Sequence, residues 1–184
     1  MKHISMESFV GELEAQAVGG FDATEVESYL EETSVEPASL ERYITFRSDH
    51  YTRNLVHKIT AFELLIICWD IGQGAPVHGH EGELCWARVE RGKLKFSNFK
   101  EVSEAPLIVE PVGDPVVGGV GFLDGPADIH AVENPVKFGE KAVSLHLYSQ
   151  PYQECDIYDL ERGEKRRVQL SYDTMHGKPV VTAI

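Results

Sequence analysis

The residues best suited to chemistry in this sequence are two histidines one residue apart, His78 and His80, followed five residues later by Cys85. Side chains at positions i and i+2 of a strand project from the same face, so both imidazoles can bind one metal ion. The alternative is that the histidines lie on a solvated strand face and that Cys85 is a small buried side chain, as most free cysteines are. The spacing favours a mononuclear metal site on a β-strand, with Cys85 beside it.

A turn separates the histidine pair from the cysteine. Gly82, between Glu81 and Glu83, predicts a tight connection between two strands. Beyond this connection the alternation of the next strand places successive side chains on opposite faces. We expect the inward face to carry Cys85, Ala87 and Val89, and the outward face to carry Trp86, Arg88 and Glu90.

A mononuclear site needs a third ligand, and His130 is the best candidate. The stretch Gly72-x5-His78-x-His80-x4-Cys85-x6-Gly92 resembles the first cupin motif, with Cys85 where many cupins have a glutamate ligand. The pattern His130-x3-Asn134 resembles the end of the second cupin motif and follows segment 123–126, which we predict to be a turn. No role is predicted for the histidines without a partner at ligand spacing, namely His3, His50, His57 and His176.

Ser144, His146 and Tyr148 alternate along one predicted strand, so their side chains share a face. An ordinary half-polar strand has the same pattern. A polar row on the inward face of a barrel, however, requires hydrogen-bonded partners, and a relay from serine through histidine to tyrosine supplies them. Serine-hydrolase chemistry is a poor alternative, because an acid at triad distance and a Gly-x-Ser-x-Gly elbow are both missing.

Length and composition indicate one soluble domain covering residues 1–184. The formal net charge of -13 disfavours binding to nucleic acid and to anionic membrane surfaces. The apolar runs are too short or too charged to span a bilayer. The three cysteines are an odd number, and no apolar N-terminal signal segment precedes them, so we expect a cytoplasmic protein without a disulfide framework. We also expect a monomer.

Two regions differ in periodicity. About residues 1–50 show helical spacing, with a capping arrangement at Asp22 and Glu25 and a helix start near Pro37, which predicts a helical cap. About residues 51–184 contain many short β-rich runs, which predict a barrel or sandwich and hence a mainly β fold. The predicted strands are 53–58, 62–69, 77–80, 84–90, 93–98, 107–111, 116–122, 129–132, 142–149, 155–159 and 168–172.

Five ordered segments resemble cysteine dioxygenase, the thiol dioxygenase branch of the cupins. They are Tyr51-Thr-Arg53-Asn-Leu-Val56, Cys68-Trp69, His78-x-His80-x4-Cys85, His130-Ala-Val-Glu-Asn134 and Ser144-Leu-His146-Leu-Tyr148-Ser149. The resemblance spans nearly the whole chain. It implies a cupin-type β-barrel, or jelly roll, behind an N-terminal helical cap.

The resemblance also implies a set of site residues. A non-haem Fe(II) would be held by His78, His80 and His130. Arg53 would bind the substrate carboxylate, with Tyr51 on the same strand face, and the pocket would be lined by His146 and Tyr148, with Ser144 fixing their orientation. In members that carry the cysteine, a thioether cross-link joins it to the tyrosine ring, which here implies a link between Cys85 and Tyr148.

Two positions depart from the best-known members: Gly79 lies where aspartate is common, and Gln150 where proline is common. The second departure leaves the conformation of the Ser149–Gln150 peptide open. The implied reaction joins L-cysteine and O2 on the iron to give cysteine sulfinic acid. Three neutral imidazoles leave three positions open on such an ion, enough for a thiolate, an amine and O2.

Three alternatives remain at this stage. One is a dioxygenase for another small thiol, such as 3-mercaptopropionate, although the resembling family carries glutamine where this chain has Arg53. Another is a non-catalytic metal-binding cupin that senses or stores a small ligand, against which the row of Ser144, His146 and Tyr148 counts. Zinc is the third, because three histidines with an open position suit that ion too.

Overall fold

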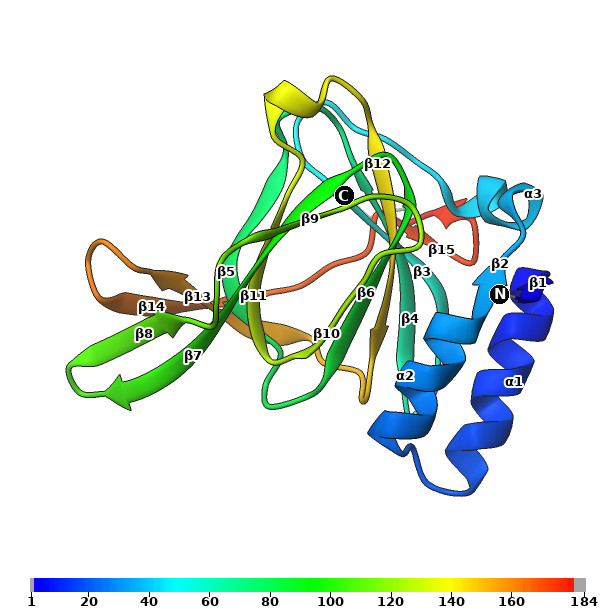
Figure 1. Ribbon diagram of the computed structural model, residues 1–184, viewed down its shortest axis with the longest axis horizontal. Helices are drawn as coiled ribbons and strands as arrows, with labels where there is room; N and C mark the ends of the chain where they lie inside the picture. Colours follow the sequence, from blue (N-terminus) through cyan, green and yellow to red (C-terminus); the bar gives the residue numbers. More distant parts are fainter. Residues whose placement is uncertain (1, 181–184) are drawn as a thin grey trace.

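The computed structural model describes residues 2–180 and forms a β-barrel of two facing sheets, with helices against the outside of one of them (Figure 1). The helical elements are α1 (Met6–Val18), α2 (Ala23–Glu32), α3 (Pro37–Leu40), η1 (Glu41–Tyr43) and η2 (Val136–Phe138). The strands are β1 (Lys2–Ile4), β2 (Thr33–Val35), β3 (Thr52–Lys58), β4 (Glu63–Trp69), β5 (Gly74–Gly79), β6 (Cys85–Arg91), β7 (Leu94–Glu104), β8 (Leu107–Pro111), β9 (Val116–Gly118), β10 (Leu123–Ala127), β11 (Ile129–Glu133), β12 (Ala142–Tyr148), β13 (Glu154–Asp159), β14 (Glu164–Gln169), β15 (Thr174–Met175) and β16 (Lys178–Pro179). The predicted mainly β fold is confirmed.

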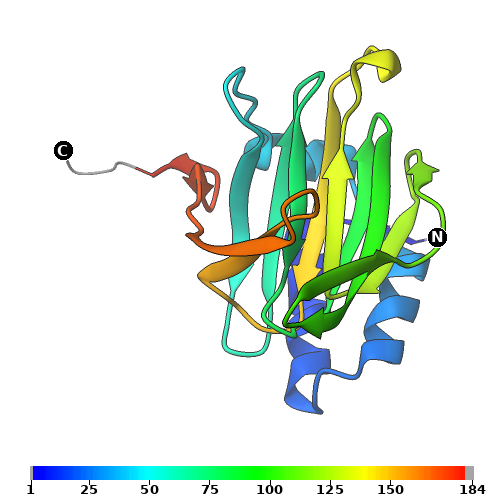
Figure 2. The ribbon, with the colours of Figure 1, turned by 90° about the vertical axis from the view of Figure 1, so that its left-hand side faces the viewer.

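The first sheet has the strand order β10-β6-β12-β4-β3-β15-β16, and the second has the order β14-β13-β5-β11-β7-β8 (Figure 2). Within these two sheets, neighbouring strands are antiparallel except where β15 runs parallel to β3. The hairpins β7-β8 and β13-β14 extend together beyond the barrel, opposite the helices (Figure 1). Because the order of strands in space differs from their order in sequence, residues far apart in the chain meet inside the barrel.

The second and third helices begin where the sequence predicts. The side chain of Asp22 accepts hydrogen bonds from the backbone N–H groups of Thr24 and Glu25, which caps α2. Ser5 caps α1 in the same way, and Pro37 occupies the first turn of α3. The sequence patterns did not reveal strands β1 and β2. They form a short parallel pair that joins the segment before α1 to the segment after α2.

Alternate side chains of the first sheet enter two different cores. One core fills the space between the sheet and the helices and contains Phe9, Leu13 and Trp86. The other lies inside the barrel and contains Cys85 and Tyr148. The alternation predicted for the strand after Gly82 is therefore confirmed, since Cys85, Ala87 and Val89 all lie in the inner core.

An outward direction would suggest that the other residues of that strand are exposed to solvent, but they are not. Trp86 and Arg88 are almost completely buried beneath the helices. The guanidinium of Arg88 donates to the carbonyl oxygens of Leu30 and Thr33 and forms an ion pair with Glu90 at 2.7 Å. The helices thus bury the outer face of this sheet, and the buried charge of Arg88 is balanced by Glu90 and by the two carbonyl oxygens.

The prediction of a turn at 123–126 is wrong. These residues belong to β10, which pairs antiparallel with β6 through a register shift between Asp124 and Ala127. Gly125 has φ +112°, and a Cβ there would lie 2.3 Å from the carbonyl oxygen of Cys85. Glycine therefore permits this irregular strand to pass close to its neighbour. The Asp, Gly and Pro residues of the segment are typical of turns, which is why the sequence did not indicate a strand.

Further strand boundaries differ from the predictions. Strand β5 covers Gly74–Gly79 rather than 77–80, so His80 lies just beyond its end. Strand β14 covers Glu164–Gln169 rather than 168–172, because its charged, exposed residues hide the hairpin that it forms with β13. Strand β9 ends at Gly118, well short of residue 122. Strand β7 runs to Glu104 rather than to residue 98, since its outer half pairs with β8 in the extended hairpin.

Two other features bear on the sequence analysis. Across residues 2–180, no helix is long and apolar enough to span a lipid bilayer. Within the same residues the cis peptides are Ala105–Pro106 and Gly125–Pro126, so the Ser149–Gln150 peptide is trans.

Candidate functional site

Three histidines meet on the inner face of the second sheet. His78 lies near the end of β5, His80 directly follows that strand, and His130 lies opposite His78 on the neighbouring β11. The ring centroids are 5.0 Å apart for His78 and His80, 4.9 Å for His78 and His130, and 4.6 Å for His80 and His130. One ring nitrogen of each lies within 4.8 Å of the others, so the three nitrogens are close enough together to hold one metal ion.

Backbone carbonyls orient two of these imidazoles. Nδ1 of His78 lies 2.8 Å from the carbonyl oxygen of Pro76, and Nδ1 of His80 lies 3.1 Å from that of Ala127. If each Nδ1 donates to its carbonyl, each Nε2 carries a lone pair toward the shared centre, the arrangement seen for metal-bound histidine. Nε2 of His80 and both ring nitrogens of His130 are buried without a hydrogen-bond partner among the described residues. These unpartnered nitrogens fit a metal ion.

The charge state of the imidazoles is also suited to metal binding. Desolvation lowers the pKa of His78 to about 3 and that of His80 well below its ordinary value, and the nearby His130 adds to both shifts. Neutral imidazole is the form that donates a lone pair to a metal. The set of three neutral nitrogen ligands fits iron(II) and leaves room for further ligands.

A polar row on the first sheet faces this triad from across the barrel. Oγ of Ser144 lies 3.0 Å from Nε2 of His146, whose Nδ1 lies 3.4 Å from the hydroxyl of Tyr148. The ring centroids of His130 and His146 are 6.2 Å apart, and those of His80 and Tyr148 are 5.4 Å apart. The predicted sharing of a face is confirmed, and the row lies directly beside the three histidines.

Cys85 joins this row from the adjacent strand. It is the register partner of Tyr148 in the pairing of β6 with β12, and its Sγ lies 3.8 Å from Nδ1 of His146. The residue is 1% exposed, and burial raises the pKa of its thiol well above the ordinary value. Burial likewise raises the pKa of Tyr148, so the phenol keeps its proton and can donate a hydrogen bond.

Arg53 and Tyr51 line a cavity of about 270 Å³ that also reaches His78 and Cys155. Arg53 is 7% exposed, and its Nε and Nη2 have no hydrogen-bond partner among the described residues. Although burial acts to lower the pKa of its guanidinium, neighbouring phenols and the Glu63 carboxylate outweigh this effect and raise it. A permanent cation with two unsatisfied donors therefore points into a cavity beside the triad.

Comparison with known proteins decides the family. The sequence model for cysteine dioxygenase type I matches residues 8–161, which is most of the chain. The chain belongs to the cysteine dioxygenase type I family. The resemblance inferred from the sequence motifs is thereby confirmed, and the protein is a cupin-type thiol dioxygenase.

Curated relatives in this family match over a similar length. The chain is 32% identical to cysteine dioxygenase type 1 of Rattus norvegicus and 30% identical to that of Homo sapiens, each over 83% of this chain and 78% of the relative. The relative from Danio rerio is 31% identical over 84% of this chain and 78% of its own length. Among solved structures, a cupin 2 conserved barrel domain protein from Leptotrichia buccalis has a TM-score of 0.47 and 15% identity, covering 61% of this chain and 47% of that one.

For this family member, sequence analysis assigned no role to three residues that the structure places in the site. Trp69 donates from Nε1 to Oγ of Ser144 at 2.9 Å. Tyr152 packs with its ring centroid 5.0 Å from that of Tyr148, and Glu63 is fully buried at the register position opposite Tyr148. The role of Trp69 could have been inferred from the sequence, because an indole on the inward face of a strand needs a hydrogen-bond acceptor for its N–H. Tyr152 lies in a loop, where alternation gives no direction.

Proposed function

We propose that this enzyme oxidises L-cysteine with O2 to cysteine sulfinic acid, using Fe(II) held by His78, His80 and His130. The observation that carries the proposal is the unpartnered guanidinium of Arg53 in a cavity that His78 of the triad also lines. A thiol bound at the triad and a carboxylate bound at Arg53 can belong to one small amino acid. The names of the curated relatives support the same substrate.

The bound ferrous ion would supply one site at which thiol and dioxygen meet and the electrons that activate O2. The protein contributes three neutral imidazoles, two of them oriented by backbone carbonyls at Pro76 and Ala127. Their lack of negative charge favours an anionic thiolate as the incoming ligand. Both oxygen atoms of O2 end on the sulfur of cysteine, and the thiol proton is released.

Arg53 binds and orients the substrate. Its guanidinium offers two parallel donors to a carboxylate, a geometry that an ammonium group cannot reproduce. The ring of Tyr51 stacks on Trp69 with centroids 4.8 Å apart, which closes the cavity wall beside Arg53. Because an arginine without a bound anion leaves its buried donors unsatisfied, thiols that carry a carboxylate are favoured over those that lack one.

The polar row would hold a proton donor at the reacting centre. Trp69 can only donate, so Ser144 accepts its hydrogen bond and is free to donate to Nε2 of His146. His146 would then carry its proton on Nδ1 and donate to the hydroxyl of Tyr148, whose own proton points to the ligand. Burial lowers the pKa of His146 well below its ordinary value, which keeps the imidazole neutral for this role.

A thioether between Cys85 and the ring of Tyr148 is part of the proposal. The register pairing of the two residues supports it. In its formation an S–H bond and a ring C–H bond are lost and one C–S bond is made, and O2 accepts the two electrons and two protons. A reduced Cys85 is a prerequisite, and Cys68, Cys85 and Cys155 are all free thiols. Free cysteines also support our proposal of a cytoplasmic enzyme, which we further propose to be a monomer.

The test is anaerobic loading of the metal-free protein with ferrous iron, followed by oxygen uptake and product mass on three thiols. L-cysteine should give one sulfinic acid per O2 consumed, and protein loaded with Zn(II) should give none. 3-Mercaptopropionate and cysteamine, which lack the amine and the carboxylate respectively, should be slower. Faster turnover of 3-mercaptopropionate than of cysteine would contradict the substrate assignment, and oxygen uptake by none of the three would contradict the reaction.

A further inference from the structure

The chain folds back over the cavity at its C-terminal side. Residues 170–176, here called the C-terminal strap, follow β14 and run beside β3 through the short parallel strand β15. Leu170, Ser171 and Asp173 of the strap line the same cavity as Arg53 and His78. The strap therefore forms part of the wall of the proposed substrate site.

Asp173 holds the backbone of Arg53 at both of its polar groups. The N–H of Arg53 donates to Oδ2 of Asp173 at 2.9 Å, and the N–H of Asp173 donates to the carbonyl oxygen of Arg53 at 2.9 Å. One of these bonds uses the Asp173 side chain and the other uses only its backbone. A substitution that removes the side-chain oxygens of Asp173, such as alanine, consequently removes the first bond and leaves the second in place.

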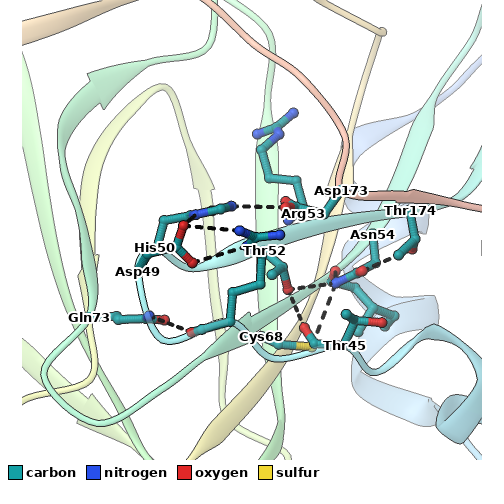
Figure 3. A network of polar contacts seen from close by, with 12 residues as sticks. Thr45, Asp49, His50, Thr52, Arg53, Asn54, Cys68, Gln73, Asp173 and Thr174 are labelled. Atoms are coloured by element: carbon teal, nitrogen blue, oxygen red, sulfur yellow. Dashed lines mark hydrogen bonds and ion pairs between the residues drawn. The ribbon is translucent and has the colours of Figure 1, made fainter. Parts of the chain in front are cut away.

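The second carboxylate oxygen of Asp173 is also engaged. Nε2 of His50 lies 2.8 Å from Oδ1 of Asp173, and Nδ1 of His50 lies 3.2 Å from Asp49 (Figure 3). The side chain of Arg53 extends away from this network, as Figure 3 shows. Oδ2 of Asp173 is thus bound by the Arg53 backbone and Oδ1 by His50, so the described bonds of this carboxylate do not go to the Arg53 guanidinium.

We propose that Asp173 is a positioning residue for substrate binding. Its carboxylate fixes the Arg53 backbone, so that the guanidinium meets the substrate carboxylate in one orientation. His50 holds the same carboxylate away from that guanidinium, so that Asp173 does not compete with the substrate. The inference rests on the proposed role of Arg53 and adds two residues to it.

The strap has a second anchor that does not depend on Asp173. The hydroxyl of Thr174 donates to Oδ1 of Asn54 at 2.9 Å, and Nδ2 of Asn54 donates to Oγ1 of Thr52 at 2.9 Å. Thr174 and Asn54 are both buried. We therefore expect variants at Asp173 to fold with the strap in place, which makes the positioning role measurable.

The experiment compares Asp173→Ala, Asp173→Asn and the control Asp49→Asn in the iron-loaded enzyme. Asp49 carries the same charge and faces the same imidazole, but the described contacts of its side chain do not include Arg53. For each protein, the KM for L-cysteine and the inhibition constant of cysteamine are measured. Cysteamine presents the thiol and amine of cysteine without its carboxylate, so its binding reports on the metal site alone.

Asp173→Ala should raise the KM for cysteine about fivefold or more, with kcat and cysteamine inhibition nearly unchanged. Asp173→Asn should have a smaller effect, because its amide oxygen still accepts from Arg53, and Asp49→Asn should resemble the parent. Equal weakening of cysteine and cysteamine, or the same change in Asp49→Asn, would show a general disturbance instead and overturn the proposal.

A double variant separates this proposal from the function on which it rests. In an Arg53→Gln background, Asp173→Ala should no longer change the KM for cysteine, because the guanidinium that it positions is gone. If Asp173→Ala retains its full effect in that background, the positioning role is wrong although Arg53 binds cysteine. If Arg53→Gln alone leaves the KM unchanged, the assigned role of Arg53 fails first.

Discussion

Cys85 and Tyr148 are register partners on the neighbouring antiparallel strands β6 and β12, and both side chains point into the barrel. They lie beside the histidine triad, with the rings of His80 and Tyr148 5.4 Å apart. Directly opposed residues of an antiparallel pair have Cβ atoms about 4.5–5.5 Å apart, within reach of a bond between side chains. The fold thus brings this pair to the separation that the proposed linkage requires.

Turnover with cysteine and O2 should convert part of the protein to a form two hydrogens lighter that migrates faster on denaturing gels. Cys85→Ser should abolish that form and keep measurable activity, since serine fills the same small site. Cys68→Ser is the matched control, because Cys68 is equally buried but belongs to the outer core. Peptide mapping that finds only unmodified Cys85 and Tyr148 after extensive turnover would exclude the linkage.

His130→Ala should remove most bound iron and nearly all oxygen uptake while the thermal unfolding transition remains cooperative. A catalytic metal site is a minor source of stability in a domain that buries two cores. The control is His57→Ala, whose imidazole pairs with Glu14 at the helical layer. Iron content at the parent level in His130→Ala would disprove the third-ligand assignment.

Arg53→Gln should reduce kcat/KM for cysteine at least tenfold, because a lost charge-assisted contact costs about 2 kcal/mol. The loss on 3-mercaptopropionate should be much smaller, since a thiol without the amine binds the metal differently and presents its carboxylate elsewhere. Steady-state kinetics on both thiols measures this difference. Equal losses would mean that Arg53 does not determine specificity.

Trp69→Phe should lower kcat several-fold with little change in KM, because Ser144 loses the donor that sets the direction of the relay to Tyr148. Because phenyl is smaller than indole and leaves a gap in the core, we also expect a loss of roughly 1–3 kcal/mol in unfolding free energy. Trp86→Phe is the matched control: Trp86 is also fully buried, but its Nε1 has no partner in the described part of the chain and faces the helices. Similar kinetic defects in both variants would argue against the relay.

The network at Asp173 predicts a pH dependence. The hydrogen bond to Asp173, aided by Asp49, raises the pKa of His50 above its ordinary 6.5. A raised pKa means that the charged contact is fully present below pH 6.5 and is lost as the pH rises through the folded-state value. The KM for cysteine should therefore increase with pH in that window, by at most about fivefold for such a partly exposed pair.

His50→Gln should remove this component of the pH profile, because glutamine can donate to Asp173 but does not titrate. The ratio of the parent KM to the variant KM at each pH cancels the ionisation of cysteine itself. The neighbouring charges Asp49, Arg47 and Asp173 remain in both proteins. A ratio that is constant across the window would contradict a role for His50.

Local patterns in the sequence determined the parts of the site that depend on one strand. The period of two in a strand places Ser144, His146 and Tyr148 on one face, and the Gly82 turn directs Cys85 inward. The same local rules located Asp22 as a helix cap. They also carried the family resemblance, because the spacing of ligands within a strand is preserved in the sequence itself.

Only the tertiary structure decided which strands face each other. The register of β11 against β5 sets His130 beside His78, and the packing of the two sheets brings Arg53 to a cavity that His78 also lines. The contact of Arg53 with Asp173 joins residues 120 positions apart, and the helices turn the outward side chain of Arg88 into a buried one. Such relationships depend on non-local pairing and burial, whose energies are shared among many residues, so no short segment of the sequence encodes them.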